Sequence, residues 1–196
     1  MHPIGPAPDG RERIHPEGAR EWRDWLEEHH ARDGGVWVVT WKGASGREGL
    51  TYDALVRECL CFGWVDATTG KVDEHRMMRW CAPRRPGSGW ARTNKERLAE
   101  LDAQGLIAPA GRAVIDQAKA DGSWTLLDSV EALEVPADLS QALAQRRGAR
   151  EHWDAWSPSA RKYALAQVAL AKRAETRAAR VAKAAEAAAR GERGYA

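Results

Sequence analysis

The sequence lacks most of the features from which a protein's chemistry is usually read. Three cysteines, Cys59, Cys61 and Cys81, are too few for a disulfide framework, and one phenylalanine and three tyrosines leave ten tryptophans as the main aromatic residues. No stretch approaches the ~20 apolar residues of a membrane helix. Residues 1–13 contain no apolar run of the signal-peptide type. We therefore expect a cytoplasmic protein with reduced thiols and no membrane span.

Charge and cofactor motifs are equally sparse. The net charge is only +2, so the chain as a whole has no polyanion-binding character. No glycine-rich phosphate loop and no spaced quartet of cysteine and histidine is present. Cys59 and Cys61 are two positions apart on an expected helix, so they point to nearly opposite sides and cannot chelate one ion. The sequence predicts neither a metal nor another cofactor.

The first half of the chain has a mixed pattern of helices and strands. Apolar spacing predicts a helix within 16–32, and Thr51 is a cap for a helix that runs to about Phe62. Residues 36–41 form an expected strand with both faces at least partly covered. We also expect a short strand at 64–66, a turn at 68–71, and a strand at 76–82 antiparallel to 36–41.

The second half is expected to be helical. Helices are predicted from about 90 to 103, from Pro109 to near 122, from Val135-Pro136 onward, from Ser157-Pro158 to about 172, and from Thr176 to Gly191. The fold class is therefore α+β, with a small, mainly antiparallel sheet and helices in the N-terminal half and an all-helical C-terminal half. The expected organisation is a flexible N-terminal arm (1–15), an α+β core with a Trp/Arg-rich segment (16–134) and a helical C-terminal subdomain (135–196).

The Trp/Arg-rich segment is the strongest candidate for a binding site. Between positions 76 and 97, seven positive residues stand against one negative residue. Arginine grips carboxylates and phosphates with a planar fork, and indole offers a stacking face. An anionic ligand with a ring, or a nucleic-acid backbone, suits this composition. The alternative is structural, with Arg84 and Arg85 paired to Asp66 or Asp73. The candidate ligand-binding residues from this reasoning are Trp64, Arg79, Trp80, Arg84, Arg85 and Trp90.

A second set of residues could perform proton transfer. Asp66, Asp73 and His75 are the candidate catalytic residues, because two carboxylates and an imidazole can act as acid and base if the fold gathers them. The alternative is that these side chains face water in loops. The basic, alanine-rich segment 172–193 is expected to be a solvated helix that packs on the domain through Val181 and its alanines.

Several motifs together resemble the YdeI/OmpD-associated family, also called bacteriocin-protection proteins. In the first half they are Phe62–Asp66, Lys71, Asp73, the run from Arg79 to Arg85, and Ser88, Trp90 and Asn94. In the second half they are Val135–Leu139, Ser157–Ser159 with Arg161–Tyr163, and Ala171–Arg177. The resemblance covers roughly residues 18–192 and adds Asn94 to the candidate ligand-binding residues. Departures include Ala67 for an expected glycine and Ala174 for an expected proline.

The resemblance implies a role in bacterial tolerance of antimicrobial peptides and bacteriocins, without a settled activity. The first hypothesis is an antimicrobial-stress or antibiotic-resistance protein that binds a small amphipathic, aromatic or anionic compound in a cleft lined by tryptophan and arginine. The second is an enzyme that modifies such a compound or acts in a biosynthetic pathway, with Arg84 as an oxyanion clamp. A nucleic-acid contact module is the least favoured. The sequence leaves open the ligand, turnover, the oligomeric state, and whether the tryptophans line a cavity or fill the core.

Overall fold

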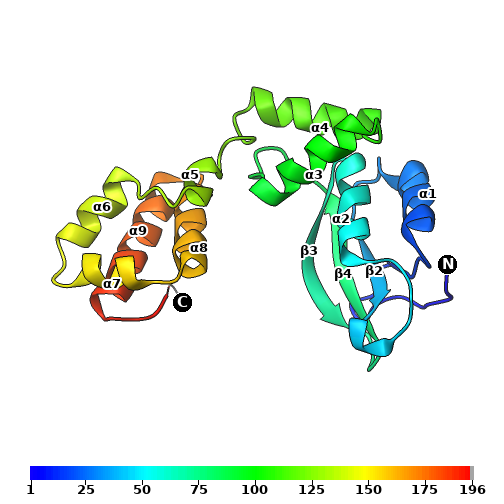
Figure 1. Ribbon diagram of the computed structural model, residues 1–196, viewed down its shortest axis with the longest axis horizontal. Coiled ribbons are helices and arrows are strands. Elements are labelled where there is room, and N and C mark those ends of the chain that lie inside the picture. The colour runs from blue at the N-terminus through cyan, green and yellow to red at the C-terminus, as the bar shows by residue number, and fades with distance from the viewer. Residues whose placement is uncertain (195–196) are drawn as a thin grey trace. The chain divides into compact units, whose positions relative to one another are not determined.

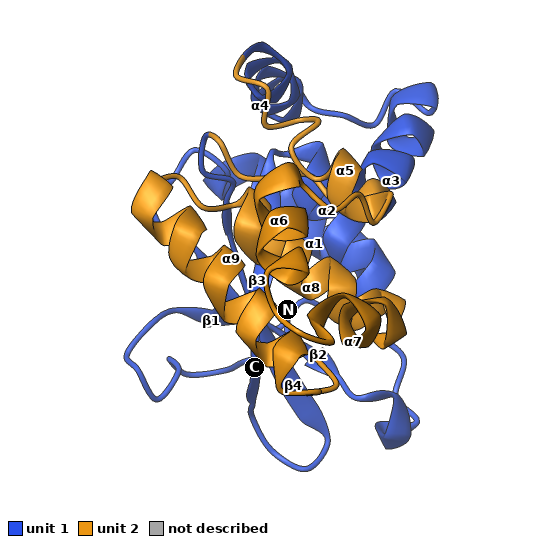
Figure 2. Cartoon of the chain, turned by 90° about the vertical axis from the view of Figure 1, so that its left-hand side faces the viewer, with its two compact units in different colours: residues 1–86, 93–120 blue, residues 87–92, 121–196 orange. Residues whose placement is uncertain are grey.

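The computed structural model describes residues 1–194 and divides the chain into two compact units. Unit 1 comprises residues 1–86 and 93–120, and it contains the sheet and the first four α-helices (Figure 1). Unit 2 comprises residues 87–92 and 121–196 and is helical (Figure 2). The predicted α+β class with an all-helical C-terminal half is confirmed. The last two residues of the predicted 135–196 subdomain lie outside the described residues.

A four-stranded sheet forms the centre of unit 1. Its strand order is β1 (Arg13–Ile14), β2 (Val36–Trp41), β4 (Arg76–Pro83), β3 (Trp64–Lys71). β1 is parallel to β2, and the other two pairs are antiparallel. The predicted pairing of 36–41 with 76–82 is confirmed. The predicted turn at 68–71 is wrong, because β3 continues through a register shift between Asp66 and Thr69 and ends at Lys71.

The helices of unit 1 are α1 (Ala19–His29), α2 (Tyr52–Cys61), α3 (Arg92–Ala103) and α4 (Pro109–Ala120). A short 3₁₀ turn, η1, spans Gly43–Ser45. α2 packs against α1 and β3 (Figure 1). The Thr51 hydroxyl caps α2 as predicted, by accepting a hydrogen bond from the Ala54 N–H at 3.2 Å. α4 approaches the end of α2 so closely that a Cβ at Gly111 would collide with the Cys61 carbonyl.

Both faces of the sheet are covered, as the sequence predicts for residues 36–41. Alternate residues of a strand point to opposite faces, so Trp37 and Val39 share one face. On that face they pack with Met78 of β4 and with Ala7 from the N-terminal segment. The segment predicted as an arm folds back here, with the His2 N–H donating to the His15 carbonyl at 2.8 Å. This side of the sheet is therefore a second, smaller core.

Up to residue 194, unit 2 contains five helices. They are α5 (Asp128–Glu131), α6 (Ala137–Ala144), α7 (Ala149–Ala155), α8 (Pro158–Ala169) and α9 (Ala174–Ala189). The predicted cap of α8 is confirmed, because the Ser157 hydroxyl accepts from the Ala160 N–H at 3.2 Å. The predicted start of the last helix at Thr176 is wrong: α9 begins at Ala174, so Thr176 lies within its first turn. Neither α5 nor α7 was predicted from the sequence.

The alanine-rich α9 is the central element of unit 2, since it packs against α6, α7 and α8. Four alanines, Ala184, Ala185, Ala187 and Ala188, are buried along it together with Val181. Small side chains let neighbouring helices approach closely, and they meet larger residues such as Trp153 from the surrounding helices. Within residues 1–194 no helix has the length and apolar character to span a membrane.

The tryptophans fill the interior. Seven of the ten are buried and the other three are half-buried, so none is exposed. A buried indole must also place its N–H, and several donate to backbone carbonyls. The buried tryptophans are Trp22, Trp25, Trp37, Trp64, Trp90, Trp153 and Trp156.

Candidate ligand-binding site

Two of the predicted ligand-binding tryptophans lie on opposite faces of the sheet. Trp64 is 1% exposed, and its ring meets those of Trp22 and Trp25 edge-on at 6.3 and 5.8 Å. Trp80 lies on the other face, 5.3 Å from the ring of Trp37. Trp64 pairs with Pro83 of β4, so these two residues share a face of the sheet. Pro83 and Trp80 are three positions apart on β4 and therefore point to opposite faces. Trp64 and Trp80 therefore cannot line one cleft.

The remaining predicted binding residues are spread over both units. Trp90 belongs to unit 2, where it is 1% exposed and its ring lies 5.1 Å from that of Trp124. Asn94 is a half-buried residue of α3, and Arg85 is exposed in the segment after β4. Arg84 is buried, and burial lowers its pKa to about 10, while the charge of Asp66 opposes that shift. The Arg84 side chain thus remains a cation at neutral pH.

The structure brings Asp66 and Arg79 together with Tyr52, a residue that was not predicted from the sequence. The Arg79 guanidinium donates to the Asp66 carboxylate at 3.1 Å. The Tyr52 hydroxyl donates to the same carboxylate oxygen at 3.4 Å, and the Arg79 guanidinium carbon lies 4.5 Å from the centre of the Tyr52 ring. We call Tyr52, Asp66 and Arg79 the Tyr52 cluster. Its three members come from α2, β3 and β4, which explains why no sequence motif contains them.

The Tyr52 cluster exposes its aromatic ring to solvent, whereas its ion pair is mostly shielded from solvent. Tyr52 is 53% exposed, whereas the side chains of Arg79 and Asp66 are 21% and 15% exposed. Burial and the neighbouring Asp66 charge raise the pKa of Tyr52, so the phenol is neutral at physiological pH. Arg97 donates to Asp53 at 2.9 Å beside the cluster. The arrangement presents a flat ring under a guanidinium whose orientation is held by a carboxylate.

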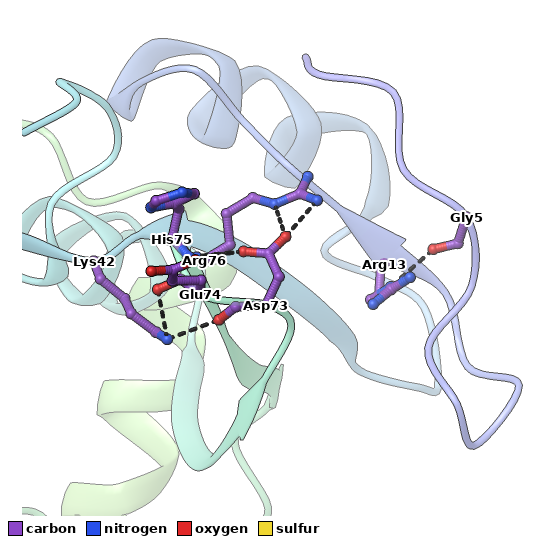
Figure 3. Close-up of polar contacts among 7 residues, drawn as sticks. All are labelled: Gly5, Arg13, Lys42, Asp73, Glu74, His75 and Arg76. Carbon is purple, nitrogen blue, oxygen red and sulfur yellow. Dashed lines mark hydrogen bonds and ion pairs between the residues drawn. The ribbon is translucent and has the colours of Figure 1, made fainter. Parts of the chain in front are cut away.

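Asp73 has a different role, at the turn between β3 and β4. One of its carboxylate oxygens accepts from the backbone N–H groups of His75 and Arg76 at 2.9 and 2.8 Å, and the other accepts from the Arg76 side chain at 2.7 Å (Figure 3). These hydrogen bonds lower the pKa of Asp73 to about 2. The Lys42 ammonium donates to the carbonyls of Asp73 and Glu74 (Figure 3). Asp73 therefore holds the turn closed.

Of the three predicted catalytic residues, Asp66 lies apart from Asp73 and His75. Asp66 lies near the start of β3, and Asp73 follows its end, so the strand separates them by roughly 20 Å at ~3.3 Å per residue. His75 is exposed beside Asp73 at the tip of the hairpin. The Cys59 thiol is fully buried, and burial raises its pKa well above the ordinary value. Among residues 1–194, no three histidine, cysteine, aspartate or glutamate side chains are grouped as metal ligands.

Comparison with protein-family models matches two parts of the chain. Residues 132–191, which contain α6 to α9, match the family described as bacteriocin-protection, YdeI or OmpD-associated, and this confirms the predicted resemblance in the second half. The chain belongs to the family described as a domain of unknown function (DUF8412), whose model matches residues 14–114, just over half of the chain. No curated protein and no solved structure shows significant similarity to this chain.

Proposed function

We propose that the protein acts in antimicrobial stress by binding a small aromatic compound that bears an anionic group, and that the Tyr52 cluster is its binding site. The observation that carries this proposal is the Arg79 guanidinium, held 4.5 Å above the half-exposed Tyr52 ring. A guanidinium above an aromatic ring forms a combined cationic and stacking surface. The match of residues 132–191 to a bacteriocin-protection family supports the stress role.

The donor count of Arg79 supports recognition of an anion. A guanidinium has five N–H groups, and among the described residues one of them is hydrogen-bonded, to Asp66. The Asp66 carboxylate orients the group, and the remaining donors can grip a carboxylate or sulfonate in a fork. The positive charge of the buried Arg84, which interacts with Asp66, adds to the attraction. The ligand ring would then stack on the exposed part of Tyr52.

Binding is a better description of this geometry than catalysis or nucleic-acid contact. The acid/base pair of Asp66 with Asp73 is not assembled, because Asp73 is roughly 20 Å away along β3. The titratable group that does contact Asp66 is the Tyr52 phenol, whose pKa is raised, so it stays protonated. Nucleic-acid binding needs a row of available cations. Three of the positive residues between 76 and 97 are paired with carboxylates, Arg76 with Asp73, Arg79 with Asp66 and Arg97 with Asp53.

The test compares an aromatic anion with its neutral counterpart. Titration calorimetry of the full chain with 2-naphthoate should give saturable binding, and 2-naphthamide should bind more weakly because it lacks the carboxylate. Tyr52→Ala should reduce the affinity for 2-naphthoate about threefold to tenfold, the usual contribution of an aromatic pair. Arg79→Lys should weaken the preference for the anion, since lysine keeps the charge but lacks the planar fork.

The controls separate loss of the site from loss of the fold. Tyr52→Phe keeps the ring and should retain most of the affinity. Tyr163→Ala, at a tyrosine of unit 2 with a similar exposed fraction of 54%, should bind like the wild type. In a bacteriocin-sensitive strain, expression of the wild type should improve survival and Tyr52→Ala should not. Equal binding of naphthoate and naphthamide, unchanged in the Arg79 variant, would exclude the proposed site.

A further inference from the structure

Unit 2 contains a small pocket that is chemically unlike the Tyr52 cluster. It has a volume of about 220 Å³ and lies between the segment after α5, the last turns of α8 and the first turn of α9. Its apolar lining comes mainly from Val130, Leu165 and Val168, which are 6%, 2% and 1% exposed. The volume equals that of about seven water molecules in the liquid, so it suits a ligand of about seven heavy atoms.

An unusual backbone conformation positions the charged residue at the rim. Leu133 has a φ of +57°, in the left-handed region that residues other than glycine rarely occupy. The Leu133 N–H donates to the Val130 carbonyl and the Glu134 N–H to the Ser129 carbonyl, at 3.0 and 2.9 Å, which closes the end of α5. The chain then turns so that Ser129, Glu134 and Val135 all border the pocket.

The rim carries an excess of negative charge. Arg177 lines the pocket, but its guanidinium is held by two hydrogen bonds to Asp138, at 2.8 and 3.1 Å, and by one to the Val168 carbonyl at 3.3 Å. Asp138 therefore neutralises Arg177. Within residues 1–194 the Glu134 carboxylate has neither a hydrogen bond nor an ion pair. An apolar interior with one uncompensated carboxylate at its mouth matches a ligand with a short apolar body and one cationic end.

We propose that this pocket binds a primary alkylammonium group, either as a free amine or as the side chain of a lysine in a peptide. The methylene chain packs on Val130, Leu165 and Val168, where it is removed from water. The ammonium group stays at the solvent-exposed mouth beside Glu134, so that it is not buried without a partner. The site is separate from the Tyr52 cluster and does not depend on the function proposed for it.

The test is an NMR titration of the full-length, ¹⁵N-labelled protein with hexylamine, hexanol and hexanoate. Hexylamine should shift the amides of residues 129–136 and 165–169 saturably, and it should bind about twofold to fivefold more tightly than hexanol, the range of exposed ion pairs. Hexanoate should bind most weakly. A titration with lysine blocked at both its amino and its carboxyl group distinguishes the two sources of the alkylammonium group. Shifts like those with hexylamine indicate the lysine side chain of a peptide, and the absence of shifts indicates a free amine.

Three variants decide between the pocket and non-specific contact. Glu134→Gln is a surface substitution and should equalise the affinities for hexylamine and hexanol. Glu151→Gln, at an exposed carboxylate of α7 that does not line the pocket, should leave the difference unchanged. Ala169→Leu should fill the pocket and abolish binding of both compounds. The proposal is overturned if hexanoate binds as tightly as hexylamine, if Glu134→Gln keeps the preference for the amine, or if no saturable shift occurs in these segments.

Discussion

The two units build their interiors from different side chains. In unit 1 the largest buried groups are tryptophans whose N–H groups are bonded: Trp22 donates to the Leu55 carbonyl at 3.2 Å and Trp64 to the His30 carbonyl at 3.0 Å. Unit 2 packs alanines of α9 against larger residues, and the buried Trp153 N–H has no hydrogen-bond partner among the described residues. Indole hydrogen bonds to carbonyls of other elements thus contribute to the interior of unit 1. In unit 2 the buried Trp156 also donates to a carbonyl, that of Glu192, but the core around α9 consists largely of closely packed alanines.

The candidate sites differ in the same way. The Tyr52 cluster lies on the surface of unit 1 and combines an aromatic ring with a guanidinium. The pocket of unit 2 is an apolar recess with a carboxylate at its mouth. We propose an anionic ligand for the first and a cationic ligand for the second, and substitutions in each unit test the two proposals separately.

The largest expected effect tests whether the units are independently stable. Trp22→Ala and Trp153→Ala should each cost about 3–5 kcal/mol, because both side chains are fully buried and leave a large cavity. Urea unfolding followed by NMR signals from both units should show the loss in unit 1 for Trp22→Ala and in unit 2 for Trp153→Ala. Each variant provides the control for the other. Equal loss of both sets of signals in either variant would show one cooperative unit instead.

A second difference is the response of the two units to acid. His15 of unit 1 is 1% exposed, and neither ring nitrogen has a hydrogen-bond partner among the described residues. Burial, together with the positive charges of His2 and Arg76, lowers its pKa from 6.5 to about 4, although Asp73 opposes the shift. The rings of His2 and Trp41 pack against it at 4.5 and 4.8 Å. The folded state therefore keeps this imidazole neutral.

The sign of the effect follows from the lowered pKa. The unfolded chain binds the proton near pH 6.5 and the folded chain only near pH 4, so unit 1 should lose stability as the pH falls through this window. The loss is at most about 3 kcal/mol, at 1.36 kcal/mol per pH unit. Urea unfolding at several pH values should show that the free energy of unfolding falls more steeply with decreasing pH in the wild type than in His15→Phe. His75→Gln, at an exposed histidine, is the control. Parallel curves for the wild type and His15→Phe would contradict this assignment.

The sequence predicts the local elements well because they depend on neighbouring residues. Thr51 and Ser157 mark two helix starts through their hydroxyls, and the alternation of residues 36–41 identifies a strand with two covered faces. The prediction of an element fails where contacts with a distant segment determine the local structure. The segment 68–71 looks like a turn in isolation, but pairing with β4 extends β3 through it. Thr176 is a good capping residue, yet α9 starts two residues earlier.

The candidate site was only partly predictable for the same reason. Asp66 and Arg79 were identified as chemically interesting, but Tyr52 joins them only because α2 packs beside the β3–β4 hairpin. The grouping of Asp66 with Asp73 and His75 rested on their closeness in sequence, whereas an extended strand places nearby residues far apart. Likewise, Trp80 and Trp90 flank Arg84 in the chain, but Trp80 lies on β4 of unit 1 and Trp90 belongs to unit 2.

The smallest expected effect tests whether a helix cap contributes equally to the stability of both units. Thr51 caps α2 in unit 1 and Ser157 caps α8 in unit 2, each by accepting a backbone N–H at 3.2 Å. Thr51→Ala and Ser157→Ala should each cost about 1 kcal/mol, since each leaves one N–H of the first turn without its side-chain acceptor. Urea unfolding of both variants measures this, and Thr51→Ser is the control that keeps the hydroxyl. Pro158 already presets the first residue of α8, so a distinctly smaller loss for Ser157→Ala would indicate that the proline alone defines the start of that helix.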